Sequence, residues 1–429
     1  METWDLVVIG GGVAGLTAAI VAARAGQRVL VCERQSTLGG RAATEHLDGF
    51  DLNLGAHAIY RGGAATRVLR SLGVSLPGAS PRTAGYVLDE GELHTMPAGP
   101  ASLLTTTFLP PAAKWEMMRR LASLTLQSPA RWRGKTTDEV VASLATQPAS
   151  RALLRALLRT ATYCADTDRS CGEAAFTQVV HLLQPGIFYV EHGWQTMIDA
   201  LAGAARQAGA TIRTGARAEA IEPAADAYTV RGEDLALRAR RVVITSAPRV
   251  ASRLLGDRSP SLASFAASAV PVRVACLDVA MRSVPAPRAR QILGIDQPIF
   301  GVLHSETVRL APPGGGVVHM LRYLREGETA TEAHREGLEE ALDRLQPGWR
   351  PLAVQQRWRP AMVAVSARIE AARGGVRGRP EVGVPELPGV FVAGDWAGHD
   401  GSLVDASFAS GWEAAQQIVI RAGGARAVA

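Results

Sequence analysis

Three glycines near the start of the sequence have the spacing of a dinucleotide-binding turn. Gly10, Gly12 and Gly15 fit the pattern GxGxxG, directly after the apolar run at residues 6–9. In such a turn the first glycine allows a tight bend, the second lets the backbone approach a pyrophosphate, and the third lets a helix pack closely against a sheet. The pattern therefore predicts that this segment holds the phosphates of a nucleotide cofactor.

The elements expected around these glycines suit the same chemistry. The apolar run is typical of a buried parallel strand, and an alanine-rich helix is expected over residues 16–25. The turn before it, with Val13 and Ala14, would offer free N–H groups and the positive end of the helix dipole to the phosphates. A second strand over 28–32 ends at Glu33, which is placed to accept hydrogen bonds from a ribose diol.

The next segments resemble a known flavoprotein superfamily. They are Glu33-Arg34, Leu38-Gly39-Gly40-Arg41-Ala42 and Gly49-Phe50-Asp51-Leu52-Asn53-Leu54-Gly55-Ala56-His57. This order is similar to that of flavin amine oxidases, protoporphyrinogen oxidases and phytoene-type carotenoid desaturases, although Asn53 stands where those proteins often carry aspartate. The resemblance implies FAD as the cofactor and Arg34 at its adenosine end. It also implies that the pyrophosphate is wrapped by Gly39, Gly40 and Arg41, and that the flavin ring is approached by the backbone of Gly55, Ala56 and His57.

A segment near the other end of the chain fits the same resemblance. Residues 388–396 predict a turn and a short strand that ends at Gly394 and Asp395, and a helix is expected over 402–415. By resemblance, Asp395 accepts hydrogen bonds from the ribityl chain or the pyrophosphate region. The backbone N–H groups near Leu403 and Val404 then face the pyrimidine edge of the flavin, where a helix N-terminus favours negative charge.

The resemblance further implies that FAD is bound without a covalent bond. Amine oxidases that tether the flavin do so through a cysteine in this terminal segment, and no cysteine follows Cys276.

The same resemblance organises the middle of the chain. A helix over 197–208 and a strand over 211–218 are expected to return to the cofactor, with the backbone at Ala218 near the adenine. The expected fold class is α/β: a Rossmann-like FAD-binding domain, discontinuous in sequence, with a mixed α+β substrate domain inserted. We expect the FAD-binding domain at residues 1–78, 190–260 and 375–429. The substrate-binding domain is expected at 79–189, which is mostly helical in its sequence pattern, and at 261–374, which has strand-like runs at 272–279, 299–303 and 317–323.

Composition excludes several classes of protein. The chain has 429 residues, of which 47% are hydrophobic and 44 are glycine, so it is globular and long enough for two or more domains. It contains no run of about 18 apolar residues and does not begin with a basic segment, which predicts neither a transmembrane helix nor a secretory signal.

The charge and the cysteines limit the kinds of partner and bound group that we expect. The net charge of +6 comes without a Lys/Arg block, so no nucleic-acid binding is expected. The four cysteines form neither CxxC nor a metal-like cluster, and we expect reduced thiols, no metal and a cytoplasmic protein that acts on a small molecule.

Residues 114–133 leave two interpretations open. Trp115, Met118, Leu121 and Leu124 are spaced by three, with Lys114, Arg119 and Arg120 elsewhere. Such a helix could lie on a membrane surface and admit a lipophilic substrate, or it could be a lid helix that faces the core. We prefer the core-facing interpretation and keep a peripheral membrane contact as the alternative.

The chain offers weak indications of the substrate. No lysine follows Lys135, whereas monoamine-oxidase-like and polyamine-oxidase-like enzymes usually carry one near flavin N5. The segment 396–401 also lacks the aromatic sandwich of the amine oxidases. We therefore favour hydride removal from a bulky, largely apolar substrate, as in the desaturases or porphyrinogen oxidases, with oxygen, a quinone or another acceptor reoxidising the flavin.

The catalytic residues stay unassigned at this point. His57, His192 and His399 are candidate bases with an ordinary pKa near neutral, but each is more often a structural residue. The alternatives are an amine or amino-acid oxidase without the lysine, a flavin enzyme without net redox turnover, and a reductase or hydroxylase fed by NAD(P)H, for which no second GxGxxG is present. An acidic substrate would suit the arginines of the substrate half, Arg282, Arg288, Arg290 and Arg309.

Overall fold

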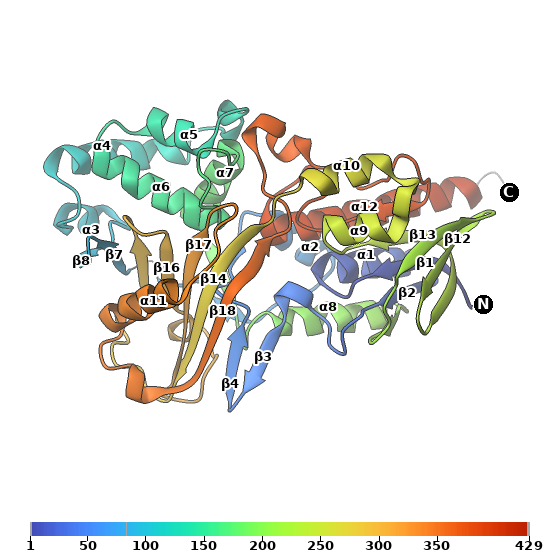
Figure 1. Cartoon of the computed structure of the whole chain (residues 1–429), viewed down its shortest axis with the longest axis horizontal. Coiled ribbons are helices and arrows are strands. Elements are labelled where there is room, and N and C mark those ends of the chain that lie inside the picture. Colours follow the sequence, from blue (N-terminus) through green and yellow to red (C-terminus); the bar gives the residue numbers. More distant parts are fainter. Residues whose placement is uncertain (1, 83, 427–429) are drawn as a thin grey trace.

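Two lobes lie side by side, and each is built on its own sheet (Figure 1). A computed structural model describes residues 2–82 and 84–426, without the side chains of residues 121, 122 and 421–426. Within these residues, each of the two large sheets has seven strands. The chain crosses between the lobes several times, so that residues from both ends of the sequence meet where the lobes join.

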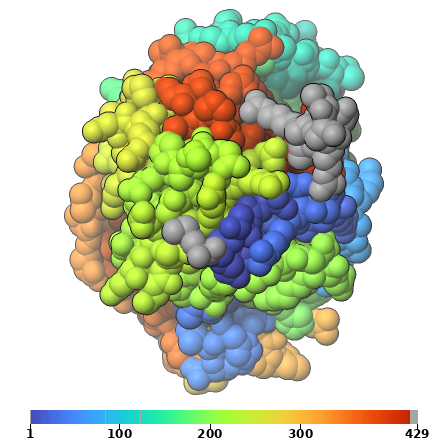
Figure 2. Space-filling model, turned by 90° about the vertical axis from the view of Figure 1, so that its right-hand side faces the viewer, coloured from blue at the N-terminus to red at the C-terminus, as the bar shows by residue number. Residues whose placement is uncertain are grey.

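The first sheet is centred on the apolar N-terminal strand. β1 (Glu2–Ile9) pairs in parallel with β2 (Val29–Cys32) on one side and with β13 (Leu235–Ile244) on the other. Figure 2 looks at the outer end of this lobe, where the dark blue N-terminal segment lies against green segments from the middle of the chain. The remaining strands are β10 (Thr211–Arg213), β11 (Ala220–Ala224), β12 (Ala227–Gly232) and β19 (Val390–Val392).

Helices cover both faces of this sheet because β1 alternates its buried side chains between them. Leu6 and Val8 pack into one core, whereas Val7 and Ile9 pack into the other. On the first face lie α1 (Val13–Arg24), α2 (Ala64–Ser71), α8 (Gln195–Gln207) and α12 (Leu403–Arg426). On the second face lie α9 (Pro248–Leu255) and α10 (Pro260–Ser268).

The second sheet forms the floor of the other lobe. Its long strands β14 (Val272–Met281) and β18 (Ala353–Val365) run antiparallel to each other, and β14 also pairs with β17 (Gly316–Leu324). The sheet continues through β16 (Ile299–Leu303), β15 (Gln291–Gly294), β7 (Tyr86–Asp89) and β8 (Glu92–Thr95).

Helices also flank this second sheet. The helix α11 (Glu332–Leu345) buries Leu338, Leu342 and Leu345 against it. A separate helical layer consists of α3 (Pro100–Thr105), α4 (Pro111–Leu124), α5 (Thr137–Leu144), α6 (Pro148–Thr162) and α7 (Gly172–Leu183).

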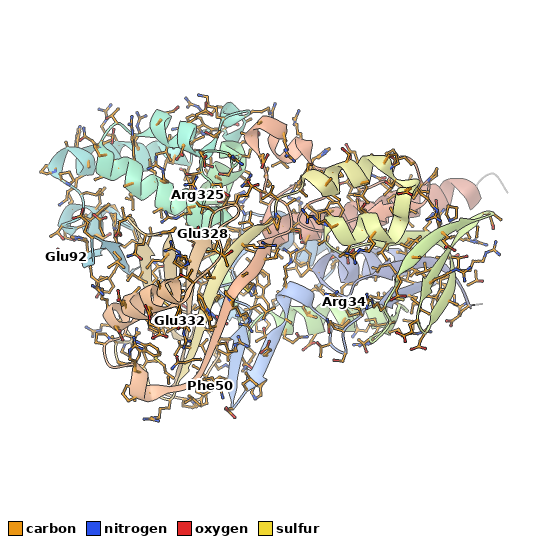
Figure 3. The ribbon with its side chains drawn as sticks, in the orientation of Figure 1. Arg34, Phe50, Glu92, Arg325, Glu328 and Glu332 are labelled. Atoms are coloured by element: carbon orange, nitrogen blue, oxygen red, sulfur yellow. The ribbon has the colours of Figure 1, made fainter. Side chains whose placement is uncertain are left out.

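Two small sheets join the lobes. The hairpin of β3 (Thr44–Leu47) and β4 (Phe50–Asn53) lies beside the second sheet, with Phe50 in its core (Figure 3). β9 (Ile187–Val190) pairs with both β5 (Ile59–Tyr60) and β6 (Gly78–Ala79).

Most of the expected elements are confirmed. The helix after the glycine turn, the helix near residue 200, the helical segment within 79–189 and the three strand-like runs of the later segment are present. The segment within 79–189 additionally supplies β7 and β8 to the second sheet, which the sequence pattern does not reveal. Within the described residues, no helix has the length and apolar character needed to cross a bilayer.

Of the side chains expected to face the core in 114–133, Leu124 is buried, but Trp115 and Met118 are not. In α4 the buried side chains are Ala113, Met117 and Leu124, whereas Trp115 is 61% exposed and Met118 39% exposed. The side chain of Leu121 lies outside the described residues. The helix thus buries a face made partly of smaller residues and presents its tryptophan to solvent.

Candidate functional site

The turn between β1 and α1 is closed on one side and open on the other. Gly10 has a φ of +112°, and its N–H donates to the Cys32 carbonyl oxygen at 2.8 Å. A Cβ on Gly15 would overlap the Gly10 carbonyl oxygen, because α1 packs closely onto the end of β1. A Cβ on Gly12 would meet only the Gly39 carbonyl oxygen, at 3.6 Å. Gly12 therefore borders open space at the N-terminus of α1, which suits a phosphate.

Glu33 ends β2 with its carboxylate turned back toward this turn. One of its oxygens accepts a hydrogen bond from the Gly11 N–H at 2.8 Å, and the other accepts one from the Gln35 N–H at 2.9 Å. The side chain is 8% exposed. Each carboxylate oxygen keeps a further lone pair, so the group holds the turn in shape and is still able to accept a hydrogen bond from a ribose hydroxyl.

Two other residues of the expected adenosine end lie near β2. Arg34 follows it directly, is exposed and lies in the first lobe (Figure 3). The strand expected over 211–218 ends at Arg213, because the N–H groups of residues 215 and 216 bond to backbone carbonyls just after β2. Ala218 therefore lies in an irregular, partly buried segment rather than in a strand.

Arg41 and Asp395 form an ion pair that joins the two ends of the chain. The Arg41 Nη1 and Nη2 atoms lie 2.7 and 2.9 Å from the two Asp395 carboxylate oxygens. The Asp395 carboxylate also accepts a hydrogen bond from the Ser366 N–H at 2.8 Å, and Arg41 donates to the Ala364 carbonyl oxygen at 3.1 Å. The ion pair thereby joins three segments: the loop of Gly39 and Gly40, the end of β18, and the turn of Gly394 and Asp395.

Both members of this pair keep their charge. Burial alone would raise the pKa of Asp395, but the charge and hydrogen bonds of Arg41 outweigh it, and the pKa is lowered. Burial alone would lower the pKa of Arg41, but Asp395 raises it above its ordinary value. The Arg41 side chain nevertheless keeps 46% exposure. Arg41 therefore reaches solvent next to Gly40, where a Cβ would meet nothing within 4 Å.

The two residues before Arg41 have positive φ angles, which favour glycine. Gly39 has a φ of +116° and Gly40 a φ of +56°. The Gly39 N–H donates to the Gly11 carbonyl oxygen at 3.0 Å, so this loop lies directly against the first glycine turn. A Cβ on Gly40 would meet nothing within 4 Å. The two loops predicted to hold the pyrophosphate are therefore adjacent and border the same open space.

The segment Gly55–His57 lies against the second lobe. A Cβ on Gly55 would lie 2.9 Å from the Met362 Cε atom of β18. The Ala56 carbonyl oxygen accepts a hydrogen bond from the Tyr163 hydroxyl at 2.7 Å. The His57 ring is stacked on Trp194, with centroids 4.2 Å apart and planes at 16°.

His57 is a neutral imidazole at physiological pH. Burial lowers the pKa of His57 to about 3, and the positive charges of His319 and Arg41 act in the same direction. The ring is only partly buried in terms of accessible surface, and its Nδ1 has no hydrogen-bond partner among the described residues. His57 therefore fits a donor or acceptor toward a bound group and does not fit a general base that titrates near pH 7.

The N-terminus of α12 carries an unusual backbone conformation. Leu403 has a φ of +55°, in the left-handed region that non-glycine residues rarely adopt. It follows Gly401 and Ser402, and both Leu403 and Val404 are partly buried. The helix itself packs closely on α1, because a Cβ on Gly411 would overlap the Ala14 carbonyl oxygen.

Asp405, in the first turn of α12, is a buried acid that sequence reasoning missed. Its side chain is 1% exposed and accepts a hydrogen bond from the Ala65 N–H at the start of α2, at 2.7 Å. Burial raises the pKa of Asp405 to about 7, and the negative charge of Asp400 adds to this effect. Gly63 makes room for this carboxylate, since a Cβ there would overlap it.

The cluster that packs against Gly55 and includes Ala56 is apolar and aromatic, and we call it the apolar wall. It is formed by side chains of β14, β16, β17 and β18 together with the end of α6. The phenol groups of Tyr163 and Tyr323 stay neutral, because burial raises the pKa of each. The members of this cluster are Ala56, Tyr163, Ala165, Val274, Cys276, Phe300, Val302, Leu321, Tyr323, Met362 and Ala364.

A buried polar cluster lies behind this wall. The Asp278 carboxylate binds His319 Nδ1 at 2.6 Å and the guanidinium groups of Arg357 and Arg359 at 3.1 and 2.5 Å. Burial would raise the pKa of Asp278, but His319 and the arginines lower it to about 2. His304 packs edge-on against His319, with ring centroids 5.3 Å apart. The cluster fixes the strands that support the wall, and the sequence shows no local pattern for it.

Several sequence candidates lie away from this region. His192 is exposed and binds Asp51 at 3.0 Å. His399 binds the Arg379 carbonyl oxygen at 3.0 Å. Trp396 is buried, stacks on Phe265 and donates to the Ser246 carbonyl oxygen, so it packs within the first lobe.

Thr245 is a further residue that sequence reasoning missed. It follows β13, and its hydroxyl donates to the carbonyl oxygens of Ile9 and Gly10 at 2.9 and 3.3 Å. The signal was available, because polar residues at the carboxyl ends of parallel strands commonly face the ligand site of such sheets.

The chain matches the family model of flavin-containing amine oxidoreductases over residues 13–419. It belongs to the flavin-containing amine oxidoreductase family. The protein is therefore an FAD-dependent oxidoreductase. When bound, FAD supplies a two-electron acceptor for a hydride from a substrate carbon.

Individual relatives are distant or match only in part. The chain is 38% identical over 111 residues to coproporphyrinogen III oxidase of Propionibacterium freudenreichii, a match that covers 24% of this chain and 20% of that protein. An oxidoreductase from Methanosarcina mazei has a similar structure, with a TM-score of 0.77 at 19% identity over 97% of this chain and 100% of the other. A protein from Exiguobacterium sp. 255-15, proposed to be a protoporphyrinogen oxidase, gives a TM-score of 0.72 at 19% identity over 98% and 99%. The structural matches establish the fold.

The described residues suit FAD. Gly12 and Gly40 border open space, the Glu33 carboxylate is bonded to the glycine turn, and the Arg41 side chain is 46% exposed. The His57 Nδ1 atom is buried and has no partner among the described residues. A hydrogen bond with a bound group would satisfy it.

Proposed function

We propose that the protein oxidises a bulky, largely apolar organic substrate. The observation that carries this proposal is the apolar wall around Gly55 and Ala56, whose partly exposed members include Tyr163, Phe300 and Met362. Such a surface stabilises a substrate mainly by burial of apolar area, at about 25 cal/mol per Å², and offers no carboxylate that would pair with an ammonium group.

The proposed reaction needs no strong base. Burial holds the pKa of His57 at about 3 and raises the pKa of Tyr163, so neither side chain accepts a proton near pH 7. Proposed roles for this chain's residues are to exclude water, to hold the substrate carbon in place, and to hydrogen-bond through neutral His57. These roles suit a reaction in which departure of the hydride makes the largest contribution.

The proposed cofactor site combines the sequence candidates with the geometry above. We propose that FAD is held without a covalent bond by Gly10, Gly12, Val13, Ala14, Gly15, Glu33, Arg34, Gly39, Gly40, Arg41, Gly55, Ala56, His57, Ala218, Gly394, Asp395, Leu403 and Val404. In this proposal Asp395 acts chiefly by holding Arg41, because its carboxylate already accepts three hydrogen bonds, two from Arg41 and one from the Ser366 N–H. The division into an FAD-binding domain at 1–78, 190–260 and 375–429 and a substrate domain elsewhere stays part of the proposal.

The names of two relatives support a bulky substrate. One oxidises coproporphyrinogen III and the other is proposed to oxidise protoporphyrinogen. Macrocycles of this kind have the large apolar surface that the wall requires. The arginines give less support to an acidic substrate than expected, since Arg290 pairs with Glu306 at 3.0 Å and Arg309 with Glu191 at 3.3 Å.

Anaerobic reduction by a panel of substrates tests the proposal. The purified protein would be mixed with a porphyrinogen, a polyene, a monoamine and an amino acid, and flavin absorbance near 450 nm would be followed in a stopped-flow instrument. We expect bleaching by a porphyrinogen or polyene and none by the amines. Bleaching by an amine alone would replace the proposal with the amine-oxidase alternative.

We further propose a peripheral membrane contact through α3 and α4. Leu104, Trp115, Met118 and Leu126 are 59%, 61%, 39% and 84% exposed, and Lys114 and several arginines stand on the same segment. Exposed apolar side chains flanked by cations are typical of helices that rest on an anionic bilayer. Such a contact would give a lipophilic substrate a direct route to the second lobe.

A further inference from the structure

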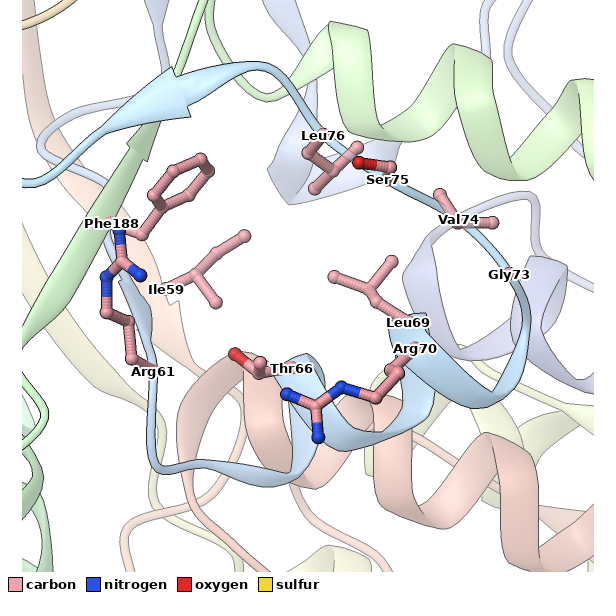
Figure 4. A pocket seen from close by; sticks show the side chains of 10 residues that line it. All are labelled: Ile59, Arg61, Thr66, Leu69, Arg70, Gly73, Val74, Ser75, Leu76 and Phe188. Carbon is pink, nitrogen blue, oxygen red and sulfur yellow. The ribbon is translucent and has the colours of Figure 1, made fainter.

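A groove of about 450 Å³ lies beside α2, away from the cofactor residues (Figure 4). We call it the α2 groove. Its floor is apolar and is formed by Ile59, Leu69, Leu76 and Phe188, of which Ile59 and Leu69 are buried in the core of the first lobe. Its volume lies within the range of small-molecule sites. None of the residues proposed to hold FAD lines it.

Two arginines without acidic partners flank this floor. Arg61 and Arg70 both line the groove (Figure 4), and among the described residues no carboxylate forms an ion pair with either. Arg61 donates from Nε to the Ser80 hydroxyl at 2.9 Å and lies over the Phe188 ring at 5.2 Å from its centroid. These contacts orient the guanidinium group and leave its outer N–H groups available.

The neighbouring arginine of the same helix behaves differently. Arg67 pairs with Asp400 on the loop before α12. Arg61 and Arg70, by contrast, place two positive charges without acidic partners among the described residues beside one apolar surface. The polar side chains of Thr66 and Ser75 complete the lining.

We propose that the α2 groove binds an amphipathic carboxylate, with its apolar body on Ile59, Leu69 and Phe188 and its carboxylate held by Arg61 and Arg70. A planar guanidinium group matches a carboxylate with two parallel hydrogen bonds, and the floor rewards burial of a hydrocarbon body. The groove is distinct from the proposed reaction site, because none of the residues that line it belongs to the proposed FAD site or to the apolar wall.

Calorimetric titration of the flavin-loaded protein with dodecanoate tests this proposal. We expect saturable binding of dodecanoate and no binding of dodecanol, which has the same chain without the charge. Arg70→Gln and Arg61→Gln should each weaken dodecanoate binding about tenfold, since each removes a charge-assisted hydrogen bond. Arg67→Gln is the matched control on the same helix and should leave the affinity unchanged.

Three results would overturn the proposal. Absence of dodecanoate binding would remove the site, and equal affinity of all three variants would show that binding occurs elsewhere. Tighter binding of dodecyl phosphate than of dodecanoate would replace the carboxylate with a phosphate as the preferred head group. Thr66→Trp, which places a large ring in the groove without changing its charge, should block dodecanoate binding and leave the flavin spectrum unchanged.

Discussion

Arg41 and Asp395 are separated by 354 positions in the chain and form an ion pair between its two ends. We expect Arg41→Met to lower the free energy of unfolding at pH 7 by about 2–4 kcal/mol. The Asp395 carboxylate would remain buried without its partner, but the 46% exposure of Arg41 in the native protein reduces the effect below that of a fully buried pair. Urea unfolding of the variant, with its flavin content measured in parallel, checks this value.

The pH dependence of this variant provides a second readout. The lowered pKa of Asp395 means that its pairing stabilises the protein above the unfolded-state pKa of about 3.9 and is lost as the pH falls through the folded-state value. The stability difference between the two proteins should therefore shrink as the pH falls below about 4. Arg67→Met, which breaks an exposed pair, should cost less than about 1 kcal/mol. Equal losses in both variants would contradict the structural role of the Arg41 pair.

The stability contribution of Asp405 depends on pH in the opposite direction from that of Asp395. Its folded-state pKa is raised to about 7, so its stabilising contribution is present at low pH and is lost as the pH rises from about 4 through 7. We expect Asp405→Asn to raise the free energy of unfolding at pH 8, by up to about 4 kcal/mol, and to have little effect at pH 4. Chemical unfolding at both pH values measures this, and Asp400→Asn is the control on an exposed neighbour. A variant that is less stable than the native protein at pH 8 would contradict this assignment.

The residues of the site differ in how far the sequence predicts them. Gly10, Gly12 and Glu33 are predictable because a strand, a turn and a helix place them within a short stretch of chain. Asp395 is predictable as a site residue but its partner is not, because contact between distant segments depends on how the lobes pack. Asp278 and His319 carry no local pattern, and only the pairing of β14 with β17 brings them together.

Substitutions at two glycines of the same motif are expected to have different effects, because the elements pack differently around them. Gly12→Glu should give a folded protein without flavin, because its side chain would enter the open space at the N-terminus of α1. Gly15→Ala should instead destabilise the fold, because its Cβ would overlap the Gly10 carbonyl oxygen where α1 meets β1. Circular dichroism and flavin absorbance of both variants measure the two effects. Normal flavin content in Gly12→Glu would contradict the assignment of the glycine turn.

The elements themselves are predictable where they are local and less so where they are not. Buried strands such as β1 and β14 are recognisable from continuous apolar runs. The register of α4 is not, because its buried face consists of Ala113, Met117 and Leu124 while the larger Trp115 faces outward. The strand expected up to Ala218 ends early because the backbone after β10 bonds to the end of β2.

The arrangement of the whole molecule leads to a prediction about membranes. Replacement of both Trp115 and Met118 by serine should reduce sedimentation of the protein with anionic vesicles by several fold, because two exposed apolar side chains are removed from the proposed contact. Stability should change little, since neither side chain is buried. Replacement of exposed Val354 by serine, on β18 of the second sheet, is the control. Unchanged sedimentation of the double variant would remove α4 from the contact.

The central claim is that an organic substrate, and not a nicotinamide nucleotide, delivers electrons to FAD on this two-lobed scaffold. The most direct measurement is the absorption spectrum of the purified protein under anaerobic conditions, before and after addition of NADPH and then NADH. We expect a yellow protein whose flavin absorbance persists with both nucleotides. Rapid bleaching by either nucleotide would contradict it and would identify the protein as a reductase or hydroxylase.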